Sequence, residues 1–454
     1  MLFSGRNRII MDSIHGLTEF DSKVRRIVDT REVQRLRWIH QTGLGFLVYP
    51  GAEHSRFAHA IGAYGVATRV FQHLRSLGEI SGLFGPSDLD DDLRQAFVIA
   101  ALCHDLGHTA FSHVLEQVLL PNGLRSHEAC TWEILEGETE VAKQIRDSCD
   151  LEQVIQLLRR VHWNKGLCNL LSGDVDVDRW DYLLRDAAAA GVVYGTYDLD
   201  WLIHSLSLEA DSVEGRPNLV IEARRGLVAL KHFLTARRSM YQQVYWHTTV
   251  RSAERMLRAI FERLLDPARP KRKKFEQGLR ILPGFKSLVA GGKPTLEEFL
   301  QTDDIAVLTA VKQWAFSSPD PVLRFLCRCF SQRRLFKQIR IPDAAVATQL
   351  PKIQEEVKAA FKRQAPSAAP ELAKTDMDIA IGYLVLVDTC KFEAQTGLQD
   401  IYFDVGEETA KTLDLLRGNP EFDIAAGLNP FSRTRAYVPG DVLEAVENAV
   451  GVRA

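Results

Sequence analysis

Apolar residues recur three and four positions apart along most of the first three quarters of the chain. This spacing places them on one face of an α-helix. The stretch GRPNLVIEARRG (215–226) differs from this pattern and is typical of a short strand or hairpin inserted between helices. The helical spacing itself predicts helices within residues 24–39, 60–77, 93–108, 180–190 and 250–265.

After about residue 330 the pattern changes to short β-like runs separated by helical sequence. The runs are KQIRI, IAIGYLVLV, QDIYFDV and RTRAYV. We therefore predict a mainly α protein with a helical core at residues 1–325 and a small α+β lobe at residues 326–454.

Charge and cysteine content narrow the class of protein. Lys and Arg number 56 against 59 Asp and Glu, so the net charge of −3 gives no global reason to bind nucleic acid or a membrane. The basic run at residues 269–274 is more typical of a solvated loop than of a nucleic-acid site. Seven scattered cysteines without a repeated CxxC pair favour a reducing compartment. Because the chain shows neither an apolar leader nor an unbroken run of about 18 apolar residues, we expect a cytoplasmic protein.

The stretch CHDLGHTAFSH (103–113) concentrates three histidines and an aspartate directly after the apolar run AFVIAAL. On a helix, His104 and His108 would share a face, whereas Asp105 would project about 100° away from His104. His104 and Asp105 can then reach one ion only if other elements enclose the helix end. Two stretches offer further ligands, HSRFAHAIG and GDVDVDRWDYLLRD, with the candidates His54, His59, Asp174, Asp176, Asp178, Asp181 and Asp186.

Two imidazoles and two carboxylates would form a mixed nitrogen and oxygen site, suited to Fe, Mn, Zn, Ni or Mg. Open positions on such an ion can hold water and substrate, and hydroxide can then form at neutral pH. An HD dipeptide alone is common by chance. Its combination with separate H and D stretches on apolar-flanked helices indicates a metal site, because buried charges need partners that core packing does not supply.

Together these residues resemble the HD-domain phosphohydrolases, and in particular the SAM-and-HD-domain deoxynucleoside triphosphate triphosphohydrolases. The resemblance begins at IIMDSIHGLTEF and continues through YPGAEHSRFAHAIG, LCHDLGHTAFSHVLE and DVDVDRWDYLLRD to QRRLFK near residue 337. Because it begins within the first dozen residues, we expect no SAM module ahead of it. It implies an HD-domain helical core and a metal held by His59, His104, Asp105 and Asp178.

The resemblance also implies a reaction. Metal-activated water would attack the α-phosphorus of a dNTP, with Mg²⁺ accompanying the nucleotide, and release a deoxynucleoside and intact triphosphate. His108, His113 and His127 would be active-site histidines, and Glu116 stands where the family has an aspartate that supports one of them. A histidine near its ordinary pKa of about 6.5 suits protonation of the leaving 5′-oxygen, and we assign this role to His127 or His113.

Matching positions imply groups that hold the nucleotide. Arg56, Arg179 and Arg237 would bind phosphates, with Arg179 in place of a family lysine. Tyr241 replaces a family histidine in the substrate pocket, and Trp246 and Thr42 replace a glutamine and a leucine, so base preference stays open. The residues implied beside the sugar and base are Gln41, Tyr182, Asp186, Tyr241 and Tyr245.

In the same family a second nucleotide site between subunits activates the enzyme. The matching positions here are Arg8, Asp29, Gln34, Arg37, Arg333 and Lys337. The resemblance therefore implies activation by GTP or a dNTP, coupled to assembly of a homo-oligomer from dimer to tetramer.

Two other functions fit the same residues. Another HD phosphohydrolase, such as a nucleotidase or an alarmone hydrolase, would release phosphate or pyrophosphate instead of triphosphate. A non-catalytic oligomer that senses nucleotides or binds nucleic acid would be favoured by a missing metal ligand, and none is missing here.

Overall fold

The structure is a computed structural model of the whole chain. The predicted basic run at residues 269–274 lies outside the part that it describes. The described residues are 8–81, 89–123, 125–210, 215–266, 279–373, 375–392, 401–406, 410–412 and 430–452.

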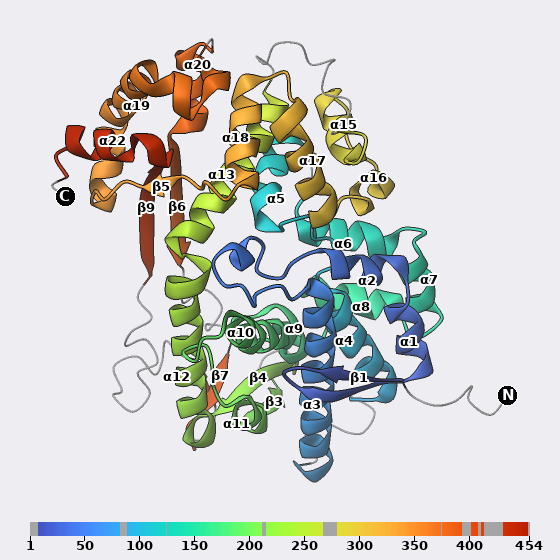
Figure 1. Cartoon of the computed structure of the whole chain (residues 1–454). Coiled ribbons are helices and arrows are strands. Elements are labelled where there is room, and N and C mark those ends of the chain that lie inside the picture. Colours follow the sequence, from blue (N-terminus) through green and yellow to red (C-terminus); the bar gives the residue numbers. More distant parts are fainter. Residues whose placement is uncertain are drawn as a thin grey trace.

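Three helices pack together in the first half of the chain (Figure 1). Helix α3 (Arg56–Ser81) contacts both α4 (Asp91–Cys103) and α10 (Val177–Ala190). Residues 96–103 of α4 are buried on every side, which explains why the sequence there is continuously apolar. The shorter helices around these three are α1 (Ser22–Val28), α2 (Arg31–Arg35), α6 (His127–Glu136), α7 (Glu140–Arg146), α8 (Leu151–Leu158), α9 (Lys165–Ser172) and α11 (Leu199–His204).

A second hydrophobic core surrounds α13 (Thr248–Leu265). This helix packs against α5 (His113–Leu119) and α18 (Pro321–Ser331), and α18 in turn packs against α17 (Asp304–Ser317). Helix α12 (Ala223–Met240) leads into α13 from the first core. The remaining helices are α15 (Pro283–Val289), α16 (Leu296–Leu300), α19 (Val346–Ala368), α20 (Met377–Leu384) and α22 (Leu443–Ala449).

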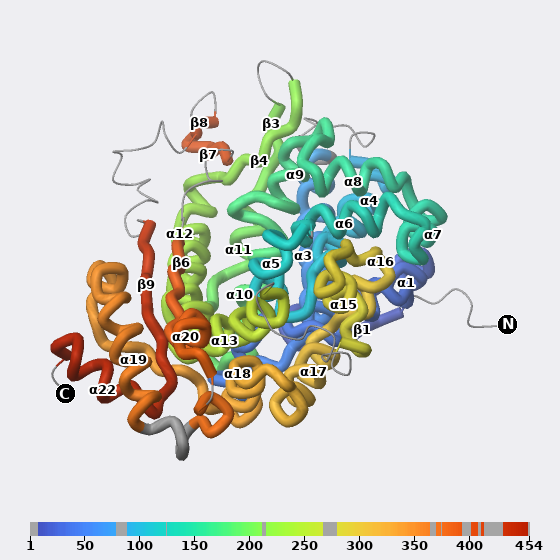
Figure 2. The backbone as a smooth tube through the Cα atoms, turned by 90° about the horizontal axis from the view of Figure 1, so that it is seen from above, coloured from blue at the N-terminus to red at the C-terminus, as the bar shows by residue number. Residues whose placement is uncertain are grey.

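The strands form three small sheets. Strands β1 (Arg8–Asp12) and β2 (Gly16–Phe20) make an antiparallel hairpin beside α3. The four-stranded sheet has the order β3-β4-β7-β8, with bounds Leu206–Ala210, Pro217–Glu222, Tyr402–Asp404 and Lys411–Thr412. The three-stranded sheet has the order β5-β9-β6, in which β6 and β9 run side by side (Figure 2), with bounds Lys337–Gln338, Phe431–Val438 and Leu386–Phe392.

The mainly helical fold class is confirmed, but several predicted elements differ from the structure. Residues 24–39 do not form one helix, because Thr30 is extended and its hydroxyl donates to the carbonyl of Ile27 at 2.7 Å. The run IAIGYLVLV is not one strand, because Asp376 caps α20 and strand β6 starts only at Leu386. Among the described residues, every helix is too short or too polar to cross a bilayer.

The division at residues 325 and 326 stays a prediction. The position falls inside α18, which packs on α13. Strand β7 also pairs in parallel with β4, with Tyr402 opposite Val220. The predicted C-terminal lobe therefore supplies a strand to a sheet in the first half of the chain.

Gly107 marks the closest approach between the segment after α4 and helix α6. A Cβ atom at this position would lie 2.0 Å from the carbonyl oxygen of His127 and 2.4 Å from the backbone nitrogen of Thr131. Backbone atoms of a packed helix cannot yield as a flexible side chain can. The absence of a side chain at Gly107 therefore sets how close α6 comes to the HD motif.

We predict that Gly107→Ala lowers the free energy of unfolding by about 3 kcal/mol, because the new methyl group would overpack against α6. The control is Gly382→Ala in α20, where a Cβ would meet nothing within 4 Å. This control should be neutral or slightly stabilising, since alanine favours helix more than glycine. Denaturant unfolding of both variants measures the difference, and equal stabilities would contradict the assigned close approach.

Candidate functional site

His59, His104, Asp105 and Asp178 converge although they come from three separate segments. His59 Nε2 lies 3.3 Å from His104 Nε2, 3.0 Å from Asp178 Oδ1 and 3.8 Å from Asp105 Oδ2. His104 Nε2 lies 3.2 Å from Asp105 Oδ1 and 3.5 Å from Asp178 Oδ1. Ligands about 2.0–2.2 Å from one cation lie roughly 3 Å from each other, so these separations fit a shared ion.

The local structure around the HD pair differs from the prediction. Helix α4 ends at Cys103, so His104 and His108 do not share a helical face, and the predicted helix through residue 108 is wrong beyond Cys103. The segment is instead a turn held by Thr131, whose hydroxyl donates to the His104 carbonyl at 3.1 Å and accepts from the Gly107 amide at 2.9 Å. Because the helix ends before them, the adjacent side chains of His104 and Asp105 can both face one point.

A neighbouring carboxylate orients His59. Asp181 Oδ2 accepts a hydrogen bond from His59 Nδ1 at 2.7 Å, which leaves Nε2 directed at the cluster. Asp181 also lies 2.7 Å from His15 Nε2 and accepts two hydrogen bonds from Arg185. Carboxylates in this position fix the ring orientation of metal-binding histidines and strengthen them as ligands.

The electrostatics of the cluster favour positive charge. Burial lowers the pKa of His59, but hydrogen bonds to Asp178 and Asp181 outweigh it and raise the pKa to about 10. Burial likewise lowers the pKa of His104, and Asp105 and Asp178 outweigh it to give a pKa of about 9. A divalent cation can supply this charge in place of protons. Two imidazole nitrogens and two carboxylates fit Fe, Mn, Zn, Ni or Mg.

A second group of histidines adjoins this cluster. His108 Nε2 lies 3.2 Å from Asp105 Oδ1, and the rings of His108 and His127 stack at 4.1 Å between centroids. Glu116 accepts from the backbone nitrogen of His127 at 2.9 Å and lies 3.0 Å from its Nδ1. The second oxygen of Glu116 lies 3.2 Å from His113 Nδ1. The structure thus brings all four predicted catalytic residues together.

The pKa values of the two stacked histidines are shifted in opposite directions. Burial, together with the charge of Arg56, holds the pKa of His108 well below its ordinary value. Burial also lowers the pKa of His127, but the hydrogen bond to Glu116 outweighs it and raises the pKa above its ordinary value. One ring therefore stays neutral while its neighbour readily carries a proton, a separation that is common where acid and base roles differ.

The three predicted phosphate-binding arginines lie around the cluster. The guanidinium of Arg56 contacts Asp105 and donates from Nε to Ser112 Oγ at 2.8 Å. Arg179 contacts Asp176 and, more distantly, Asp174 at 3.7 Å. Arg237 lies 3.5 Å from the same Asp174 carboxylate, and its buried Nε has no partner among the described residues.

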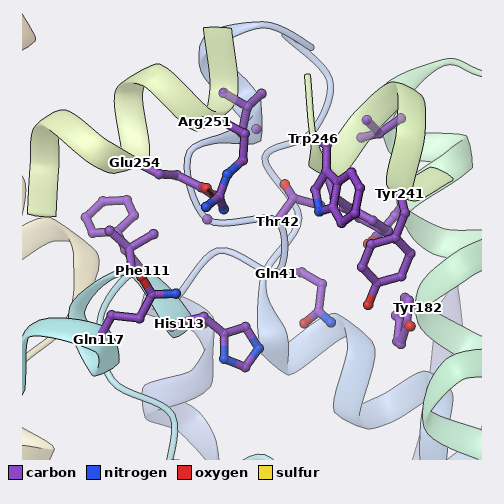
Figure 3. Close-up of a pocket in the computed structure, with 18 of the residues that line it drawn as sticks. Gln41, Thr42, Phe111, His113, Gln117, Tyr182, Tyr241, Trp246, Arg251 and Glu254 are labelled. Carbon is purple, nitrogen blue, oxygen red and sulfur yellow. Dashed lines mark hydrogen bonds and ion pairs between the residues drawn. The ribbon is translucent and has the colours of Figure 1, made fainter. Parts of the chain in front are cut away.

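A cavity of about 400 Å³ opens on one side of the cluster (Figure 3). Tyr182, Tyr241 and Trp246 line one wall. The opposite wall includes Gln117 and Glu254. Arginines and carboxylates also line this cavity, and its aromatic faces suit the base of a nucleoside.

A second cavity of about 590 Å³ lies on the other side of the cluster and is lined mainly by imidazoles, arginines and carboxylates. It contains the metal-cluster residues His104 and Asp105 together with His108 and His127. The two cavities meet at six residues that line both of them: Gln41, Arg56, His113, Asp178, Arg179 and Tyr182.

Of the predicted sugar-side residues, Gln41 and Tyr182 lie at this junction, whereas Asp186, Tyr241 and Tyr245 line only the first cavity. Asp186 accepts from the hydroxyl of Tyr245 at 2.6 Å and lies 2.7 Å from His54 Nε2. Gln41 Oε1 is buried and has no partner among the described residues. Residues 241–245 form a π-helical turn between α12 and α13, a feature that is frequent at functional sites.

The predicted effector residues fall on two parts of the structure. Arg8 donates to Asp29 at 2.8 Å, and Arg37 donates to the side chain of Gln34 at 2.8 Å. Arg333 and Lys337 lie elsewhere, at the end of α18 and in β5. Arg333 donates to the carbonyl of Leu47 at 2.7 Å. The structure places the first four residues near the N-terminal hairpin and the other two beside the second core.

Sequence reasoning missed several residues at the site. His15 lies within IIMDSIHGLTEF, but nothing in that stretch indicated a contact with Asp181. Arg251 and Glu254 in α13 line the nucleoside-like cavity, and their ion pair at 2.5 Å falls on a face that looked like an ordinary amphipathic helix. Asp304 was also missed, because it lies 264 residues from His40 and 193 residues from Phe111, the two residues that it contacts.

Comparison with known proteins places this site in a family. Residues 57–186, which span all four clustered residues, match the HD domain. The chain is 32% identical over 337 residues to the protein YwfO of Bacillus subtilis, covering 73% of this chain and 72% of that protein. It is 31% identical over 221 residues to the deoxynucleoside triphosphate triphosphohydrolase SAMHD1 of Bos taurus, but spans only 36% of the length of that relative.

A solved structure extends the similarity to almost the whole chain. The crystal structure of a phosphohydrolase from Bacteroides thetaiotaomicron is 27% identical, superposes with a TM-score of 0.75, and covers 95% of this chain and 100% of its own. The HD match, the metal cluster and these relatives agree. The chain belongs to the HD-domain phosphohydrolase family.

Proposed function

We propose that the chain is a metal-dependent dNTP triphosphohydrolase that cleaves a dNTP to a deoxynucleoside and triphosphate. The observation that supports this most is the junction of two chemically different cavities at the metal cluster. Arginines line both cavities, but the aromatic faces of the first suit a nucleoside, and the second, which four histidines line, suits a polyphosphate. A substrate that spans both places its α-phosphate at the cluster, between sugar and phosphate chain.

In this proposal His59, His104, Asp105 and Asp178 would hold the cation, which would supply positive charge to polarise the α-phosphate and activate water. Water adds to the α-phosphorus as the bond from phosphorus to the 5′-oxygen breaks. Arg56, Arg179 and Arg237 stabilise the charge that moves onto the phosphate oxygens. The nucleotide brings its own Mg²⁺.

The leaving 5′-oxygen needs a proton, and the histidine pair held by Glu116 can provide it. We assign the general acid to His127 or His113, since one carboxylate orients both rings. Burial and the charge of Arg56 hold the pKa of His108 well below its ordinary value, which favours its neutral form. Tyr182, Asp186, Tyr241, Tyr245 and Gln41 hold the nucleoside.

The regulatory part of the proposal concerns the effector residues. Arg8, Asp29, Gln34 and Arg37 would bind a GTP or dNTP activator together with Arg333 and Lys337, which the C-terminal lobe at residues 326–454 supplies. The distribution over two separate surfaces suggests that the two halves come from different subunits of a dimer or tetramer. Binding at such an interface favours the assembled form by mass action.

We predict that the purified protein with Mn²⁺ or Mg²⁺ converts a dNTP into deoxynucleoside and triphosphate in equal amounts, because the α-phosphate lies at the cluster. The measurement is chromatography of products after incubation with each dNTP and NTP, singly and in pairs. Monophosphate with pyrophosphate, or free phosphate alone, would contradict the proposed cleavage and support a different phosphohydrolase.

We predict that His113→Ala lowers kcat by about a hundredfold or more, the usual loss when a general acid or its partner is removed. Metal content should not change, since His113 is no ligand in this proposal. Metal analysis and turnover measure the two effects. The matched control is His232→Ala, another exposed histidine, which lies away from the cluster and should keep full activity.

We predict that GTP together with a dNTP raises both the apparent mass and the rate of hydrolysis, by about tenfold for the rate. Asp29→Asn should weaken this response because it removes the carboxylate that pairs with Arg8. Asp200→Asn, which alters a surface ion pair with Arg69, is the control. Gel filtration and rates without any response in the wild type would refute the effector site.

A further inference from the structure

Asp304 is a fully buried carboxylate that joins two distant loops. It is the first residue of α17. Its Oδ2 accepts from the backbone nitrogen of His40 at 2.8 Å and lies 2.7 Å from His40 Nδ1. Its Oδ1 accepts from the backbone nitrogen of Phe111 at 2.7 Å. A buried carboxylate destabilises a protein unless donors surround it, so these three contacts hold both loops to the helix.

The contact with Phe111 holds a strained turn. Phe111 and Ser112 have φ angles of +49° and +46°, a region that residues other than glycine rarely adopt. Such conformations persist only where neighbouring contacts fix them, and they concentrate at functional sites. Ser112 accepts from Arg56 at 2.8 Å, and the next residue is His113. The Asp304 contact therefore acts on the segment that presents His113.

The contact with His40 holds the other loop. The His40 ring lies 5.0 Å from the Phe46 ring and 6.5 Å from the Phe111 ring, nearly parallel to the latter at 6°. Its Nε2 lies 2.9 Å from Glu53. Since both ring nitrogens face carboxylates, the ring is fixed at both ends. The following residue is Gln41, whose buried Oε1 has no partner among the described residues.

Gln41 and His113 both line the two cavities at their junction. Each is one or two residues from a group that Asp304 binds. We propose that Asp304 is a positioning residue, which through His40 and Phe111 fixes Gln41 and His113 relative to each other at the substrate. The kinetic consequence of this inference rests on the proposed function. Asp304 itself reaches neither cavity.

The test compares Asp304→Asn with Asp303→Asn. The Asp304→Asn variant keeps the size of the side chain, but only one of its two terminal atoms can still accept a hydrogen bond. Either the contact with His40 or the contact with Phe111 is therefore lost, and one loop loses its anchor. We expect kcat to fall by about 10- to 100-fold with unchanged metal content, because small displacements of catalytic groups have effects of this size. Asp303 caps α17 by accepting from Ala306 at 2.8 Å, and asparagine caps equally well. The Asp303→Asn variant should therefore keep wild-type kcat.

Coupling to Gln41 separates positioning from a general loss of stability. If Asp304 acts through Gln41, Asp304→Asn will lower kcat/KM much less in a Gln41→Ala background than in the wild type. Equal fold-losses in both backgrounds would overturn this link. The His40→Gln variant keeps the Asp304 carboxylate and removes the imidazole, with its contacts to Asp304 and Glu53, so it should reproduce the coupling even if Asp304→Asn folds poorly.

Crystal structures of the metal-loaded wild type, Asp304→Asn and His40→Gln proteins give a readout that needs no substrate. We expect residues 40–42 to shift in His40→Gln, and in Asp304→Asn we expect a shift of whichever loop loses its acceptor, residues 40–42 or residues 110–113. Unmoved loops in folded variants would overturn the inference. A wild type that hydrolyses no nucleotide would refute the proposed function, while the loop positions would still decide the role of Asp304.

Discussion

Negative charge buried around His59 must be balanced, and this requirement organises the first half of the chain. Asp105, Asp178 and Asp181 all lie within 4 Å of that imidazole. Arg185 neutralises one of them from within the same helix, and a cation shared with His104 can neutralise the others. Carboxylates from α10 and from the turn after α4 can meet at one ion only where these segments converge on the start of α3. The balance of charge at the site therefore requires that these three helices pack together.

The second core contributes to the site through polar groups at the ends of its helices and not through its apolar interior. Arg35, buried behind the HD turn, donates to the carbonyls of His108, Leu300 and Thr302 at 2.8–2.9 Å. Asp304 follows closely on that segment and binds the loops on the other side. The segment that links α16 to α17 is therefore joined to the HD turn through Arg35, and to the loops at His40 and Phe111 through Asp304.

The sequence was most informative where the chemistry is local. His59, the HD pair and Asp178 could be selected because each lies in a short motif with apolar flanks. The structure brings His59, His104 and Asp178 within reach of one ion and places Asp105 beside the two histidines. The path of the chain was harder to predict, since the break after Cys103 depends on a hydroxyl contributed by Thr131 in another helix. Asp304 gave no signal at all, because a carboxylate at a helix start usually serves only as a cap. The effector residues rest on matching positions, and their joint role stays a prediction.

The parallel pairing of β4 with β7 has a consequence for how the protein is made. Strand β4 is already paired with β3, but its other edge stays open until residues 402–404 have left the ribosome, after most of the chain has been synthesised. During that interval the backbone groups of a largely buried strand are unpaired and prone to join a foreign strand. Completion of this sheet thus awaits a segment that is synthesised well after β4, which couples the final folding of the first half to that of the later residues.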